Sequence, residues 1–158
     1  MGFQDKYDEY KERQEAKNYF RRNNDLYLKS DQWVKVIVLG IVGAIVVGIV
    51  LGVIISLIHI SSMLFYLVAG YVIGNIVTRV SGVNSQQMGI LAGVLAVLSF
   101  IVVNMTLMYY PLMQLGLPFD ISILFELFVS ASKQLLIGDL FRTLMAIVGV
   151  AFAYQQAQ

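Results

Sequence analysis

The stretch VIVLGIVGAIVVGIVLGVIISLI, residues 36–58, decides the fold, because it runs for 23 residues without a charged side chain. An α-helix rises ~1.5 Å per residue, so the segment reaches ~34 Å and can cross a hydrocarbon layer ~30 Å thick with some tilt. Trp33 and Lys35 precede it, and this pairing of aromatic and basic residues is typical of a headgroup boundary. The stretch therefore predicts a first transmembrane helix.

Three further apolar segments follow the first one. The second span is predicted over residues 63–80, where Arg79 and the polar turn SGVNSQQ close it. The third, over 88–110, again has 23 uncharged residues, and Pro111 is expected to end its helix. The fourth is predicted over about 139–156. Its fully apolar part is short, so it can cross only if flanking residues extend it or the bilayer is locally thinner.

Residues 119–137 are apolar but carry two charges. On a helix, Glu126, Ser130, Lys133 and Gln134 form one polar stripe. A charge at the bilayer centre costs ~2.5–3.5 kcal/mol on insertion scales, so an interfacial or re-entrant helix is favoured over a span. The alternative has five spans, with residues 121–137 crossing and the C-terminus on the opposite side.

The whole composition agrees with a membrane protein. Hydrophobic residues make up 58% of the chain and charged residues 13%, against roughly 45–50% and 25% in soluble domains. Eight of the 11 Lys and Arg residues and seven of the 10 Asp and Glu residues occur up to Lys35. We expect an all-α, polytopic helical bundle over residues 31–158, preceded by a charged helix and linker over 1–30.

The basic residues near the first span also predict its orientation. Lys and Arg next to spans are retained on the cytoplasmic side, so the N-terminus is predicted to be cytoplasmic in a multi-pass protein of the cell membrane. The N-terminal helix is either solvated or lies on the membrane surface, with Lys17, Arg21 and Arg22 at anionic headgroups. Its basic residues are matched by acids, so nucleic acid is not an expected partner.

Small residues recur along one face of each span, where helices in lipid can approach closely. They are Gly40, Ala44, Gly48, Gly52 and Ser56 in the first span, Gly70 and Gly74 in the second, and Gly89 and Gly93 in the third. Two interpretations remain open for the long stripe of the first span. It packs inside a small bundle, or it faces a second subunit or another membrane protein.

A few polar and ionisable residues interrupt the apolar segments: His59, Asn75, Asn104, Glu126, Lys133, Asp139 and Arg142. His59 is expected to form an interfacial hydrogen bond. The two asparagines are expected to bond between helices or to line a path for a solute. Glu126 and Lys133 are too far apart to pair, Asp139 and Arg142 are expected to pair, and the group is otherwise a candidate headgroup or partner site.

No catalytic residue, metal ligand set or cofactor motif is predicted. The chain has no cysteine and one histidine, which argues against thiol chemistry, a metal centre and a histidine-based triad. The favoured hypothesis is a non-catalytic membrane protein that acts by self-association or as the accessory subunit of a membrane assembly. The alternatives are a small transporter or channel subunit and, less favoured, a binder of lipid headgroups.

Overall fold

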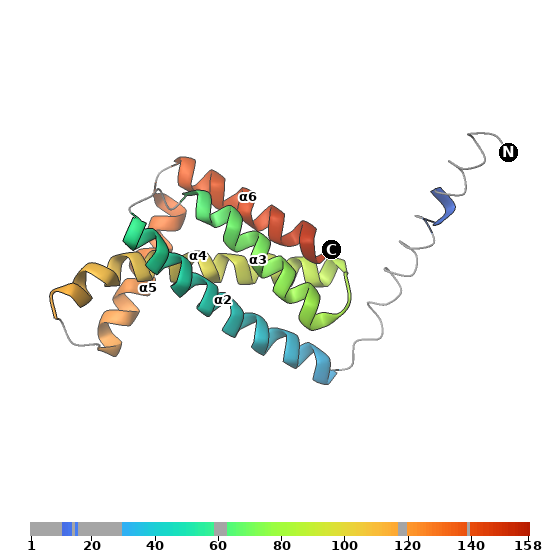
Figure 1. Cartoon of the computed structure of the whole chain (residues 1–158), viewed down its shortest axis with the longest axis horizontal. Helices are drawn as coiled ribbons and strands as arrows, with labels where there is room; N and C mark the ends of the chain where they lie inside the picture. The colour runs from blue at the N-terminus through green and yellow to red at the C-terminus, as the bar shows by residue number, and fades with distance from the viewer. Residues whose placement is uncertain (1–10, 14, 16–29, 59–62, 117–119, 139) are drawn as a thin grey trace.

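A computed structural model describes residues 11–13, 15, 30–58, 63–116, 120–138 and 140–158. Every regular element in these ranges is an α-helix, which confirms the predicted all-α bundle (Figure 1). The elements are α2 (Ser30–Ile58), α3 (Met63–Ser81), α4 (Gln86–Gln114), α5 (Ile121–Ile137) and α6 (Leu140–Ala157). Of the predicted N-terminal helix, the structure describes only residues 11–13 and 15, which are helical.

Three of these helices, α2, α3 and α4, are long and apolar enough to cross a membrane. A fourth span is obtained if α5 and α6 are taken as one broken element, and the two helices make an angle of 96°. Length and composition alone support this count. The count of three or four agrees with the predicted number of about four, but α6 qualifies only together with α5 and not as the separate fourth span that the sequence predicted.

One helix end differs from the prediction. Pro111 lies inside α4, which continues to Gln114, so the predicted end at this proline is wrong. Proline lacks only its own N–H bond, and here the following residues still close a tight last turn. The N–H of Leu115 donates to the carbonyls of Pro111 and Leu112, and Gly116 adopts a φ of 71° beyond it.

The helices pack around a central pair, α3 and α4. α2 contacts only these two, and α6 lies across the same pair on the other side without contacting α2. α5 packs on α4 and, less extensively, on α6 (Figure 1). The largest fully buried side chains come from α3 and α4, and they are Tyr66, Phe100, Ile73 and Met88.

The end of α6 lies beside the turn between α3 and α4. The backbone N–H of Ser85 donates to the carbonyl of Ala157 at 3.2 Å, and the Thr78 hydroxyl donates to the carbonyl of Gln156 at 3.0 Å. Since α3 ends and α4 begins at this turn, α6 runs parallel to α3 and antiparallel to α4. The five-span alternative needs α6 to end on the opposite side, so the structure does not have that arrangement.

Candidate functional site

The small-residue stripe of α2 faces α4. A Cβ added to Gly40 would lie 2.5 Å from Leu95 Cδ1, one on Gly48 2.6 Å from Val102 Cβ, and one on Gly52 2.5 Å from Thr106 Cβ. Ala44, on the same stripe, is fully buried, and the Ser56 hydroxyl donates to the carbonyl of Gly52 in its own helix at 2.8 Å. The alternative in which this stripe faces a second subunit therefore does not hold, because α4 of the same chain already covers it.

The glycines of α3 and α4 face α6. A Cβ on Gly70 would collide with the carbonyl oxygen of Gly149, and one on Gly74 would lie 2.8 Å from the carbonyl oxygen of Ala153. On α4, a Cβ at Gly89 would lie 2.8 Å from the Tyr154 ring. These contacts bring the backbones of α3 and α6 together at Gly70 and Gly149, and at Gly74 the Cβ of Gln156 also lies against α3.

A buried polar pair lies between α3 and α4. The Tyr66 hydroxyl donates to Asn104 Oδ1 at 3.0 Å, and the exposed fractions of the two residues are 0% and 1%. The Tyr66 ring also packs on Phe100, with ring centroids 4.9 Å apart and planes at 42°. Gly149 of α6 lies against the same two residues, so this cluster joins three helices.

Two polar atoms in this interior have no hydrogen-bond partner among the described residues. They are Asn104 Nδ2 and Ser99 Oγ, both on α4 and both buried. An unpaired buried polar group costs about 1–3 kcal/mol. Tyr66 satisfies only the oxygen of the Asn104 amide, so the nitrogen still carries this cost.

Asn75 does not join Asn104. It lies nine residues after Tyr66 on α3, which is roughly 13 Å along the helix axis at ~1.5 Å per residue. Its Nδ2 donates to the carbonyl of Tyr71 in the same helix at 3.0 Å, and its side chain is on the outward face of α3. The structure thus places the two asparagines on different faces, and no single path runs past both.

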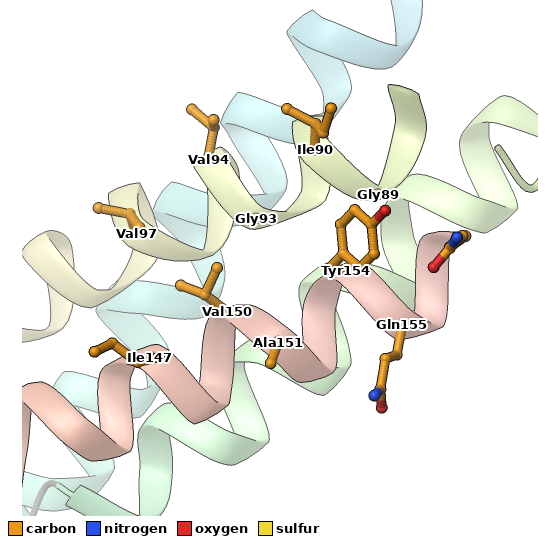
Figure 2. Close-up of a pocket in the computed structure, with 11 residues that line it drawn as sticks. Gly89, Ile90, Gly93, Val94, Val97, Ile147, Val150, Ala151, Tyr154 and Gln155 are labelled. Carbon is orange, nitrogen blue, oxygen red and sulfur yellow. The ribbon is translucent and has the colours of Figure 1, made fainter. Parts of the chain in front are cut away.

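An open groove runs between α4 and α6 on the flank of the bundle, with a volume of roughly 680 Å³. Figure 2 shows Ile90, Val94 and Val97 along one side, Ile147 and Val150 opposite, and the Tyr154 ring standing over Gly89. Gln155 marks its polar end but points away from it in this view. The groove fits an apolar chain and contains no titratable group other than the Tyr154 phenol among its lining residues.

A second groove of roughly 450 Å³ lies where α2, α4 and α5 come close. Its lining is apolar apart from Thr106 and two tyrosines, Tyr109 and Tyr110 of α4. α2 and α5 both line it without packing on each other, so α4 forms its floor. Like the first groove, it has a surface suited to hydrocarbon and lacks clustered polar groups.

The polar stripe of α5 stays outside the bundle. Asp120 caps this helix, accepting from the N–H of Ser122 at 3.4 Å, and Glu126 and Lys133 are both exposed. Ala131 and Leu135 are the buried residues of α5, on the side that faces the other helices. The structure therefore keeps the two charges apart from the buried polar pair.

Arg142 is partly buried at the start of α6, and its Nε has no hydrogen-bond partner among the described residues. The neighbouring Thr143 hydroxyl donates to the carbonyl of Leu135 at 3.1 Å, which fixes α6 to α5. Asp139, the predicted partner of Arg142, lies outside the described residues, as does His59. No group of three or more His, Cys, Asp or Glu residues that could hold a metal ion occurs in the described ranges.

The residue that sequence reasoning missed is Tyr66. A signal for it existed, since a tyrosine inside an apolar helix must find a partner for its hydroxyl, and the amide of Asn104 is one of few candidates. Compared with known proteins, the chain matches no family model, no curated protein and no solved structure, so its function is argued from its own residues.

Proposed function

We propose that this protein is a non-catalytic, multi-pass protein of the cell membrane that acts by self-association or as an accessory subunit of a membrane assembly. The observation that supports its place in a membrane is the large uncovered apolar surface of α2. Buried residues make up 22% of its apolar stretch, against 44% in α4. Val38, Val42, Val46 and Val50, one per turn, are each exposed by 50% or more.

Such a face is costly in water and favourable in lipid or against another helix. Each Å² of apolar surface that stays in water costs about 25 cal/mol of free energy relative to burial. The stripe of small residues on α2 is taken up inside the bundle, so a partner would have to meet one of the outward faces.

The arrangement of helix ends supports a cytoplasmic N-terminus. α2 and α4 begin, and α3 and α6 end, at the same end of the bundle. This end carries Lys35 and Arg79, and Lys17, Arg21, Arg22 and Lys29 precede α2 in the sequence. Because basic residues are retained on the cytoplasmic side, we infer that the turn between α3 and α4 lies inside the cell.

A solute path remains the alternative, although the two asparagines that motivated it lie on separate faces. Extraction and co-purification test the proposal. We expect tagged protein to stay in membranes at alkaline pH, and native mass spectrometry from mild detergent to find a homo-oligomer or a stoichiometric membrane partner. Release by carbonate would contradict the membrane assignment. A lone monomer that conducts a solute in proteoliposomes would favour the transporter.

A further inference from the structure

We propose that the outward face of α3 pairs two copies of this chain side by side in the membrane, with the Asn75 amides of the two copies hydrogen-bonded to each other. The inference rests on the proposed function and deepens it, because it names the surface and the occupant.

The outward face of α3 is one regular stripe. Its members, spaced by four, three, four and four residues, are Leu64, Val68, Tyr71, Asn75 and Arg79. Leu64, Val68 and Tyr71 are exposed by 59%, 47% and 51%. The other sides of α3 are occupied, by α2 near Ile76 and by α6 at Gly70 and Gly74.

Asn75 lies within the predicted hydrocarbon layer. The side chain of Ile76 meets Gly43 of α2, so Asn75 is close to the level of Gly43. Gly43 follows Lys35, at the headgroup boundary, by eight residues, or ~12 Å along a helix. In a layer ~30 Å thick, this is inside the hydrocarbon but short of its middle, which agrees with the four residues, or ~6 Å, that separate Asn75 from Arg79 in α3.

The side-chain oxygen of this amide lacks a hydrogen-bond donor. Asn75 Nδ2 donates to the carbonyl of Tyr71, and within the described part of the chain Asn75 Oδ1 accepts no hydrogen bond. Lipid tails supply no donor, so leaving this oxygen unpaired is unfavourable. The structure thus shows a polar oxygen with no donor among the described residues, and a second copy of the chain can supply one.

A second copy supplies that donor with the right geometry. All copies have the same orientation in a membrane, so a two-fold axis along the membrane normal sets α3 parallel to its counterpart and Asn75 opposite Asn75. A carboxamide carries both donors and an acceptor, so the pair satisfies both copies. The spacing of four and three residues matches a left-handed helix pair, in which a single asparagine fixes the register.

The flanking residues are compatible with this pairing. Arg79 lies one turn nearer the end of α3, where a long basic side chain reaches the headgroups. Although α2 and α6 both pack on α3, neither covers the stripe, because Leu64, Val68 and Tyr71 stay exposed.

Disulfide cross-linking in native membranes tests the surface, and the absence of cysteine from the chain makes single-cysteine variants clean probes. We expect Val68→Cys and Tyr71→Cys to form disulfide-linked dimers on oxidation. Matched cysteines on outward faces of other helices, Val46→Cys on α2 and Ile147→Cys on α6, are expected to stay unlinked.

The amide itself is tested by measuring the dimer dissociation constant in detergent. Asn75→Leu is expected to raise it roughly three- to thirtyfold, the range of interhelical hydrogen bonds in membranes. Asn75→Gln should retain most of the affinity, and Gln155→Leu, an amide lost from α6, should leave it unchanged. Helix content of Asn75→Leu by circular dichroism shows that the variant is folded.

The outcomes separate this inference from the proposed function. Cross-linking only at Val46 or Ile147 would overturn the α3 surface while self-association stands. An unchanged dissociation constant in Asn75→Leu would overturn the amide pair. A chain that is monomeric and without a partner under all conditions would overturn both proposals.

Discussion

At the scale of single residues, the hydrogen bond from Tyr66 to Asn104 is a measurable source of stability. Tyr66→Phe keeps the ring on Phe100 but leaves Asn104 Oδ1 buried beside an Nδ2 that is already unpaired. We expect the free energy of unfolding to fall by about 1–2 kcal/mol. Thermal unfolding in detergent, followed by circular dichroism, measures the loss.

A double variant provides the control for this prediction. Asn104→Leu removes the remaining polar partner, so Tyr66→Phe combined with Asn104→Leu should be more stable than the sum of the two single losses implies. Strict additivity would show that the two side chains do not interact in the folded protein.

The glycines differ in the atoms that an added methyl group would contact, and this difference gives a second prediction. Gly70→Ala places a methyl group against the backbone of Gly149, which cannot move aside, whereas Gly93→Ala meets only Val150 Cγ1 at 3.3 Å. Overpacking of this kind costs about 1–3 kcal/mol, so Gly70→Ala should lower the melting temperature and Gly93→Ala should change it little. Equal effects would contradict the close contact of α3 with α6.

The sequence alone identified the small residues but not what they face. Regular spacing shows that Gly48 and Gly52 share a side of their helix, yet a partner helix within the chain and one outside it leave the same pattern. The two asparagines show the same limit. Asn75 and Asn104 look alike in an apolar segment, and only the packing of the helices turns one inward and the other outward.

At the scale of elements, α5 has three distinct sides. Ala131 and Leu135 face the bundle, with Phe128 at the edge of that side, while Phe125 is exposed on an apolar side and Glu126 and Ser130 are exposed on a polar side. A helix lying along a membrane surface needs these three environments, namely protein, lipid and water. Its angle of 96° to α6 suits this position.

Accessibility to a water-soluble maleimide tests this position of α5. In liposomes, Glu126→Cys and Ser130→Cys should react quickly, and Phe125→Cys and Phe128→Cys slowly, because only the first pair faces water. All four positions react in detergent-unfolded protein, which serves as the reference. Protection of Glu126→Cys as strong as that of Phe125→Cys would indicate a helix that crosses the bilayer.

The ends of the helices were predictable where the sequence changes from apolar to polar residues. The ends of uncharged stretches and the polar turn before α4 mark such changes, and α2, α3 and α6 end within a residue or two of the predicted spans. The prediction from Pro111 was wrong because the effect of a proline depends on its position in the helix. A proline near the end of a helix removes one hydrogen bond, and α4 continues past it for a further turn.

At the scale of the whole molecule, the positions of the helix ends predict which loops share a side of the membrane. Asn84, in the turn beside the end of α6, and Leu115, at the end of α4, lie at opposite ends of the bundle. With a cytoplasmic N-terminus, a membrane-impermeant thiol reagent should label Leu115→Cys in intact cells and Asn84→Cys only after permeabilisation. Permeabilised cells control for intrinsic reactivity. Labelling of both positions from outside would contradict an α4 that crosses the membrane. The reverse pattern would keep the fold and invert the orientation, because the basic residues at one end of the bundle, and not its packing, set the side on which that end is retained.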